Sequence, residues 1–251
     1  MKAGIIAAGD GSRLKSEGLR LPKPLVRVDG VPLIERLITT FVRAGITEVH
    51  CIVNEYSLEV KSYVESRDLG VPVHFVVKTT PSSMHSLFAL APHLSDGPFL
   101  LSTVDAIFDE RELAGYLAHA TARCAEADAV LAVTEFIDDE KPLYAACDAS
   151  WRIARFSKTA PAKHVTGGLY VFSPRVFREI EPVLASGMER LSAFLGHLVG
   201  AGYRIEGFPF TKMIDVDHVR EVFATQPKAQ SSGRASRSAL PPISVIGRLN
   251  G

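Results

Sequence analysis

The order of apolar segments constrains the fold more than any other feature of this sequence. Short apolar runs typical of buried strands alternate with segments whose apolar residues recur at helical spacing. A strand joined through a helix to the next strand favours a parallel sheet with crossover helices, so we predict an α/β fold. The predicted strands span 3–8, 49–53, 73–77, 99–104, 129–134, 144–147, 168–172, 204–208 and 213–216, and the predicted helices span 33–44, 58–65, 83–94, 110–122, 174–184 and 189–201.

Length and composition favour one large domain. The chain has 251 residues, of which 47% are hydrophobic, enough for a full core. We assign that domain to residues 1–225, and we expect residues 226–251, rich in Ser, Gly, Pro and Arg and without an acid, to form a flexible tail.

Charge and cysteine content restrict the partners and the compartment. The 28 basic and 28 acidic side chains cancel, which argues against nucleic acid or an anionic membrane as partner. The three cysteines lack metal-ligand spacing and suit a reducing compartment. The first apolar run is too short for a signal peptide, and no run approaches the ~18 residues of a membrane span. We therefore expect a cytoplasmic protein.

The stretch GIIAAGDGSRLKSEGLRLPKP, residues 4–24, joins a strand-like run to a glycine-containing loop. A dinucleotide-binding loop would need glycine at Leu14, and a P-loop would need Lys-Ser/Thr after Gly9, where Asp10 stands. Both common phosphate-binding patterns are thus excluded by spacing alone.

The same stretch still has the chemistry of an anion site. Its glycines place successive backbone N–H groups at the carboxyl edge of a parallel sheet, where α/β proteins bind ligands. Arg13 adds a fixed positive fork, and we expect Pro22 and Pro24 to hold Lys23 in an extended segment that returns a second cation to the pocket. The sequence therefore predicts a local phosphate site.

The motifs AAGDGSRL and PKPLV resemble the signature of the sugar-phosphate nucleotidylyltransferase family, enzymes of the EC 2.7.7 class. The resemblance covers residues 1 to about 225. It implies a three-layer, Rossmann-like fold with a mixed, mostly parallel sheet flanked by helices. It also implies transfer of a nucleotidyl group from a nucleoside triphosphate to a phosphorylated sugar or alcohol, with release of pyrophosphate. The catalytic residues would be Arg13 and Lys23, and the nucleotide-binding residues would be Ala8, Gly9, Gly11, Ser12, Arg13 and Ser83.

Two acidic residues are candidate ligands of Mg²⁺, the cofactor that the resemblance implies. Asp105 ends a buried strand, the place where α/β enzymes position metal-binding carboxylates. Asp215 lies in the segment where the family has its second metal aspartate, whereas Asp217 precedes a helix-like run and is more simply a helix N-cap.

The acceptor side matches the family less closely. In FSKTAPAKHVTGGLYVFSP, Lys158 matches the lysine that binds the acceptor phosphate, and Thr166, Gly167 and Gly168 match the acceptor-binding strand. Ser157, however, stands where the hexose enzymes carry a carboxylate. Ser82 and Ser83 are closer to the cytidylyltransferases that act on phosphocholine or inositol phosphate, which favours CTP over UTP or dTTP.

Three alternatives stay open at this point. One is a regulatory subunit that binds a nucleotide sugar without turnover, but the acidic and basic site residues are retained. A molybdopterin-type nucleotidyltransferase normally lacks the PKPLV and GGLYVF segments, which are present here. A glycosyltransferase of similar fold would need an Asp-x-Asp motif where TVDAIF has a single acid.

Overall fold

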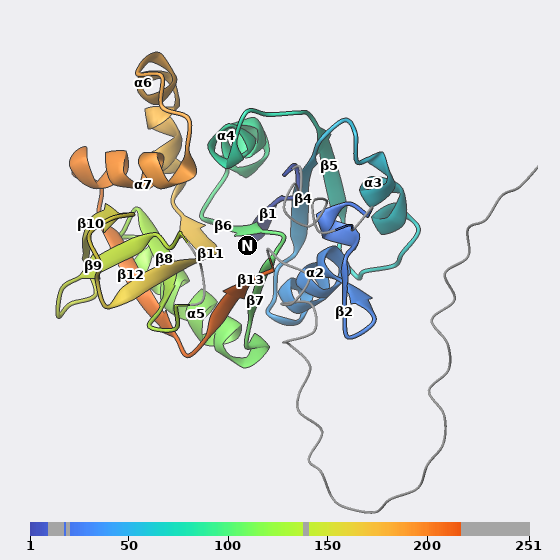
Figure 1. Cartoon of the computed structure of the whole chain (residues 1–251), viewed down its shortest axis with the longest axis horizontal. Helices are drawn as coiled ribbons and strands as arrows, with labels where there is room; N and C mark the ends of the chain where they lie inside the picture. The colour runs from blue at the N-terminus through green and yellow to red at the C-terminus, as the bar shows by residue number, and fades with distance from the viewer. Residues whose placement is uncertain (10–17, 19–20, 138–140, 217–251) are drawn as a thin grey trace, which may run out of the picture.

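The computed structural model describes residues 1–9, 18, 21–137 and 141–216. Within them, one nine-stranded sheet runs in the order β10-β9-β11-β6-β1-β4-β5, with β8 paired to β11 and β12 paired to β8 (Figure 1). The strands are β1 (Lys2–Ile6), β4 (Glu48–Val53), β5 (Val73–Val77), β6 (Phe99–Thr103), β8 (Ala129–Thr134), β9 (Tyr144–Cys147), β10 (Ile153–Ser157), β11 (His164–Phe172) and β12 (Ile205–Phe210).

Strand direction divides the sheet into two parts. Strands β6, β1, β4 and β5 are mutually parallel, and β12 is parallel to β8. Strand β11 is antiparallel to β6, β8 and β9. The carboxyl ends of β6, β1 and β4 therefore lie at one edge, where the first half of the antiparallel β11 also lies. The predicted α/β fold with a mixed sheet is confirmed.

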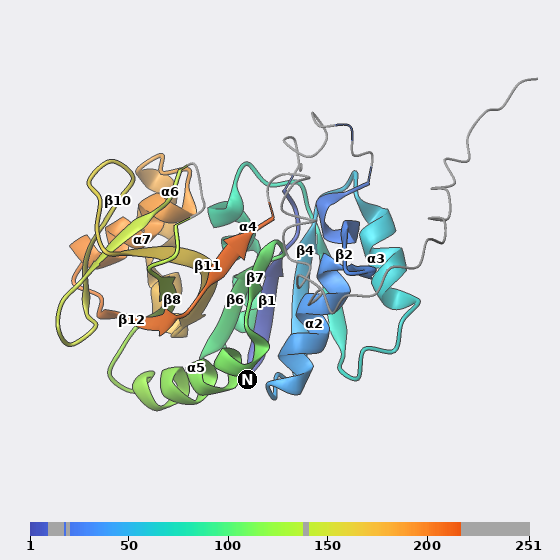
Figure 2. The same ribbon diagram turned by 60° about the horizontal axis from the view of Figure 1, so that its bottom comes forward.

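Helices cover both faces of the sheet. One hydrophobic cluster joins the sheet to α2 (Leu33–Arg43), α3 (Leu58–Glu65) and α5 (Glu110–Arg123). A second cluster joins the opposite face to α4 (Ser83–Leu94), α6 (Ile180–Ala185) and α7 (Leu191–Gly200). Figure 2, in which the bottom of Figure 1 comes forward, shows α2 and α5 on the near side of the sheet. A sheet buried on both faces explains the nearly continuous apolar runs of the central strands.

Several short elements complete the described part of the chain. Strand β7, which follows Asp105, pairs with β13 near the end of the described chain, and β2 pairs with β3 ahead of α2. Two 3₁₀ helices precede β2 and α6, so the helix predicted for 174–184 is a 3₁₀ segment followed by one short α-helix. These elements are η1 (Lys23–Leu25), β2 (Arg27–Val28), β3 (Val31–Pro32), β7 (Ala106–Phe108), η2 (Pro174–Glu179) and β13 (Met213–Asp215).

No helix in the described ranges combines the length and the apolar character needed to span a membrane. The expected tail, residues 226–251, lies outside those ranges.

Candidate active site

The two predicted metal-binding aspartates lie next to each other. Asp105 follows the end of β6, and Asp215 on β13 is paired in register with Ala106 on β7. The backbone N–H of Val216 donates to the carbonyl oxygen of Asp105 over 3.1 Å. Figure 1 shows β13 beside β7 near the middle of the molecule. Two segments 110 residues apart in the sequence thus bring their carboxylates to one edge of the sheet.

Gly168 on the predicted acceptor strand lies close to Asp215 of this pair and to Thr103 at the end of β6. Its φ of +71° is favourable mainly for glycine. A Cβ at this position would lie 2.6 Å from Thr103 Oγ1 and 3.5 Å from Asp215 Oδ1. The preceding Gly167 is equally restricted, because a Cβ there would lie 2.3 Å from the sulfur of Met213. Only a strand with two glycines can lie this close to β6 and β13.

Lys23, which precedes both aspartates in the sequence, reaches the same site from η1. Its Nζ forms an ion pair with Asp105 Oδ2, and only 12% of the Lys23 side chain and 19% of the Asp105 side chain are exposed. Burial alone would raise the pKa of Asp105, but the charge and hydrogen bond of Lys23 outweigh it, and the pKa lies below its usual range. The structure thus brings the predicted catalytic residue Lys23 into contact with a predicted metal ligand.

The expected extended conformation around Lys23 is wrong. Residues 23–25 form one 3₁₀ turn, closed by hydrogen bonds from Leu25 N to Pro22 O (2.9 Å) and from Val26 N to Lys23 O (3.1 Å). Proline is tolerated in the first turn of a helix because its missing N–H would have no partner there. The turn, rather than an extended strand, positions the Lys23 side chain.

The polar groups around the aspartates suit a hydrated divalent cation. Asp105 Oδ1 and Thr103 Oγ1 are both buried and have no hydrogen-bond partner among the described residues. No cluster of three or more His, Cys, Asp or Glu side chains suited to a metal occurs in the described ranges. Mg²⁺ usually binds one or two protein carboxylates and completes its shell with water and substrate phosphates. The pair Asp105 and Asp215 fits that donor set.

The pKa of Tyr170, a residue that sequence reasoning did not select, is affected by both carboxylates. Burial raises the pKa of its phenol, and the negative charges of Asp215 and Asp105 raise it further. The phenol of Tyr170 is therefore neutral in the folded protein. Tyr170 lies two residues beyond Gly168 on β11. The sequence signal was its position in GGLYVF, at an interval of two from the glycine.

On the nucleotide side, the structure describes the start of the loop. Ala8 and Gly9 follow β1, where Gly9 is exposed and a Cβ on it would meet nothing within 4 Å. The buried Asn54, one residue past β4, donates from Nδ2 to the carbonyl oxygen of Ala8 over 3.3 Å. Asn54 was missed by sequence reasoning, although an amide directly after a buried strand was the available signal. The predicted residues Gly11, Ser12 and Arg13 lie outside the described residues.

Ser83 begins helix α4 close to the same edge. The preceding Ser82 is the N-cap, and its Oγ lies 3.0 Å from His85 Nδ1. Ser82 and His85 thus stabilise the helix start, and the nucleotide-binding role of Ser83 stays a prediction.

The predicted acceptor residues divide into two groups. Gly168 lies at the aspartates, and Thr166, half-buried on β11, is paired in register with Val133. Lys158, one residue past β10, is exposed and forms no ion pair with the described residues. Ser157 Oγ accepts hydrogen bonds from the N–H groups of Thr159 and Ala160 at 3.2 and 2.8 Å, so this hydroxyl stabilises the turn that presents Lys158.

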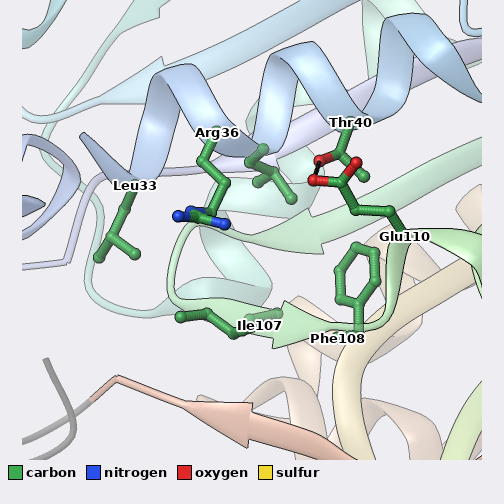
Figure 3. Close-up of a pocket in the computed structure, with 8 residues that line it drawn as sticks. Leu33, Arg36, Thr40, Ile107, Phe108 and Glu110 are labelled. Carbon is green, nitrogen blue, oxygen red and sulfur yellow. Dashed lines mark hydrogen bonds between the residues drawn. The ribbon is translucent and has the colours of Figure 1, made fainter. Parts of the chain in front are cut away.

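A small pocket lies behind Asp105, between α2 and β7 (Figure 3). Its volume of about 60 Å³ is far too small for a nucleotide. Two of its polar residues already bond to each other, because Thr40 Oγ1 donates to Glu110 over 3.0 Å. Arg36 donates to the carbonyl oxygen of Val28 over 3.1 Å. We therefore regard this pocket as packing behind the site.

Comparison with known families settles the class of the chain. A family model described as a MobA-like NTP transferase domain matches residues 3–199. The chain belongs to this family of nucleotidyltransferases. Solved NTP transferases share its fold: an inositol-1-phosphate CTP transferase from T. maritima has a TM-score of 0.76 at 23% identity, covering 88% of this chain and 90% of the other. A putative glucose-1-phosphate thymidylyltransferase from Bacillus anthracis has a TM-score of 0.78 at 18% identity, with 89% and 94% covered.

Curated relatives of this NTP transferase are named for different nucleotidyl groups. A CMP-5'-(3-aminopropyl)phosphonate synthase from Streptomyces rubellomurinus is 30% identical over 56% of the chain, which spans 25% of that protein. A UTP–glucose-1-phosphate uridylyltransferase from Haloferax volcanii is 26% identical over 82% of the chain and 86% of its own length. A mannose-1-phosphate guanyltransferase from Schizosaccharomyces pombe is 29% identical over 72% of the chain, which spans about half of that protein (52%).

Proposed function

We propose that the protein joins a nucleoside triphosphate to a phosphorylated small molecule and releases pyrophosphate, with Mg²⁺ as cofactor. The observation that carries this proposal is the meeting of Lys23, Asp105 and Asp215 with the acceptor strand at the carboxyl edge of the sheet. Family membership and the similarity to nucleotidyltransferases from several organisms support the same reaction class.

The reaction explains why these residue types are needed. A triphosphate and a phosphomonoester together carry about six negative charges at neutral pH, which must be offset before one phosphate oxygen attacks another phosphorus in line. Arg13 would hold the departing β and γ phosphates, and Lys23 would bind the reacting α phosphate. Lys158 would anchor the acceptor phosphate. Mg²⁺, held by Asp105 and Asp215, would supply charge neutralisation and a template for the phosphates.

The acceptor phosphate is itself an anionic nucleophile, so the reaction needs no general base. The described residues around the aspartates agree with that requirement: Lys23, which pairs with Asp105, is a cation rather than a base, and the buried Tyr170 has a raised pKa. The protein's contribution is to position two anions and to neutralise their repulsion.

For the substrates, we propose CTP and a non-hexose phosphate, such as an inositol or amino-alcohol phosphate. Ser157 in place of the hexose carboxylate favours this choice, since a site that leaves sugar hydroxyls unpaired loses roughly 1–3 kcal/mol for each. The Streptomyces relative, named for a CMP-linked aminopropylphosphonate, supports it. The Haloferax relative, named for UTP and glucose 1-phosphate, favours the second candidate, a hexose uridylyltransferase.

A pyrophosphate-release panel tests both the proposed reaction and the proposed substrates. It crosses four nucleoside triphosphates with glucose 1-phosphate, inositol 1-phosphate, phosphocholine and 3-aminopropylphosphonate, in the presence of Mg²⁺. We expect the fastest release with CTP and a non-hexose acceptor. A preference for UTP or dTTP with glucose 1-phosphate would overturn the substrate assignment. Silence in every pair would overturn the reaction and favour a module that binds nucleotides without turnover.

A further inference from the structure

Asp105 has two competing demands on one carboxylate. The proposed reaction assigns it to a divalent cation, whereas in the structure its Oδ2 accepts a charged hydrogen bond from Lys23 Nζ. Both side chains are largely buried, so water screens this ion pair only weakly. An ammonium group and a metal ion cannot bind the same oxygen along the same direction.

The surroundings of Asp105 make this ion pair the main anchor of its carboxylate. Its other oxygen, Oδ1, is buried without a hydrogen-bond partner among the described residues, and the same holds for the nearby Thr103 Oγ1. Strand β11 packs closely against Thr103, because a Cβ at Gly168 would lie 2.6 Å from Thr103 Oγ1. Lys23 approaches from η1, on a turn that lies outside the main sheet.

We propose that Lys23 and a divalent cation compete for Asp105, so that the cation binds the free protein weakly and binds tightly only once a triphosphate has drawn Lys23 away. The proposal rests on the nucleotidyl-transfer function described above and adds a coupling between its two ligands. A ligand whose binding-competent state is populated in one molecule in ten has a roughly tenfold weaker apparent affinity. By linkage, the cation must strengthen triphosphate binding by the same factor.

The coupling would allow the site to release its cation after the reaction. Two adjacent carboxylates with a tightly held cation would retain the metal after pyrophosphate leaves. A lysine that returns to Asp105 displaces the cation and resets the site. The same ammonium group would then bind the α phosphate in one state and the metal ligand in the other.

The first test uses the unaltered protein, without nucleotide. Lysine side chains are acetylated briefly with and without saturating Mn²⁺, and the extent of modification at each lysine is read by mass spectrometry. We expect Mn²⁺ to increase labelling of Lys23 several-fold. Lys61, which pairs with Glu65 on the exposed face of α3, serves as the internal control and should not change. Equal labelling of Lys23 in both conditions would overturn the proposal.

The second test measures Mn²⁺ affinity by electron paramagnetic resonance of the unbound ion. We expect Lys23→Met to bind Mn²⁺ about tenfold more tightly than the natural protein, and Lys23→Arg to stay close to it. The variant Lys61→Met controls for the loss of one positive charge. The double variant Lys23→Met/Asp105→Asn should lose the gain. Unchanged affinity in Lys23→Met, or a gain that survives in the double variant, would contradict competition for Asp105.

Neither test requires turnover or knowledge of the base. A protein that exchanges Lys23 for Mn²⁺ yet is silent in the pyrophosphate panel would retain the coupling and lose the proposed reaction. A protein that turns over without the exchange would retain the reaction and lose the coupling.

Discussion

Asp105 is the residue on which the charges of the site converge. Its carboxylate pairs with Lys23, its backbone carbonyl accepts from Val216, and its neighbour Ala106 is paired with Asp215. Replacing the carboxylate by an amide of the same shape keeps most of this packing while removing the charge.

Asp105→Asn should abolish Mg²⁺-dependent activity and leave the fold intact. We expect the lost ion pair to lower the free energy of unfolding by about 1–3 kcal/mol, because Lys23 stays largely buried. Pyrophosphate release and urea unfolding measure the two effects separately. Asp215→Asn should also inactivate, whereas Asp217→Asn, outside the described residues, should cost about 1 kcal/mol or less as a helix cap. Global unfolding of Asp105→Asn would mean that Asp105 is mainly structural.

The joining of Lys23 to Asp105 could not be predicted from sequence. The motif around each residue indicated its chemistry, but 82 residues separate them, and no local pattern reports a contact at that distance. The short turn at Lys23 was mistaken for an extended segment because proline disfavours helical geometry in the residue before it. Hydrogen bonds across that turn outweighed the local preference.

At the scale of elements, β11 carries the tightest constraint. Gly168 has a positive φ, and its Cα faces Thr103 on the neighbouring strand. A side chain at this position would strain the backbone and push β11 away from β6.

Gly168→Ala should destabilise the protein by about 1–3 kcal/mol, the usual cost of a strained backbone, and should reduce activity strongly. Gly115 on α5 is the matched control, because a Cβ there meets nothing within 4 Å. Gly115→Ala should stabilise by about 0.5–1 kcal/mol, since alanine favours helix interiors. Urea unfolding of both variants checks the pair. Equal behaviour of the two variants would refute the steric argument for β11.

Element prediction succeeded where the apolar pattern was strong and failed where it was weak. Helix 58–65 and strands 73–77, 129–134 and 144–147 have the predicted bounds. Strand β10, IARFS, was missed because it has only two large apolar residues and lies at the end of the sheet. Strand β11 begins four residues earlier than predicted, since its two glycines interrupt the apolar pattern without interrupting the strand.

A stack of histidines lies near the amino-terminal ends of the strands. His50 on β4 lies between His74 of β5 and His93 of α4, with ring centroids 5.0 and 5.1 Å away. Glu48 Oε1 lies 2.8 Å from His50 Nε2 and also faces His74, while Lys2 of β1 bridges Glu48 and Asp96. Burial lowers the pKa of His50 despite the nearby Glu48.

At the scale of the whole molecule, this stack predicts a loss of stability in mild acid. A histidine whose pKa is lowered by folding takes up its proton more readily when unfolded. The stability that His50 contributes to the folded state is therefore complete at pH values above its ordinary pKa of 6.5. This stability decreases as the pH falls below that value. Burial also lowers the pKa of His164, so this residue adds to the same loss of stability as the pH falls.

His50→Gln should weaken part of this pH dependence, because it removes a histidine whose pKa is lowered by folding. Urea unfolding of the variant and of the natural protein at pH 7.5 and pH 5.5 measures the difference. A pH dependence identical in His50→Gln and the natural protein would show that His50 does not cause it.

Removal of residues 226–251 tests the expected domain boundary. Their composition, without an acid and rich in Ser, Gly and Pro, predicts that they bury little apolar surface. The shortened chain should keep its melting temperature within about 2 °C, less than the shift expected for a loss of 1 kcal/mol. It should also keep its pyrophosphate release. A large drop in either would place part of the folded domain in this segment.

The pairing of β11 with both β6 and β8 limits how the enzyme moves. Residues 169–172 lie in register with β6 on one side, and residues 170–172 lie in register with β8 on the other. Domain closure requires a hinge of a few residues that can change backbone conformation. Here such a rotation would break two hydrogen-bonded ladders at once. We therefore expect the end of β6, which leads to the proposed metal ligand Asp105, and the proposed acceptor strand β11 to stay fixed relative to each other during turnover.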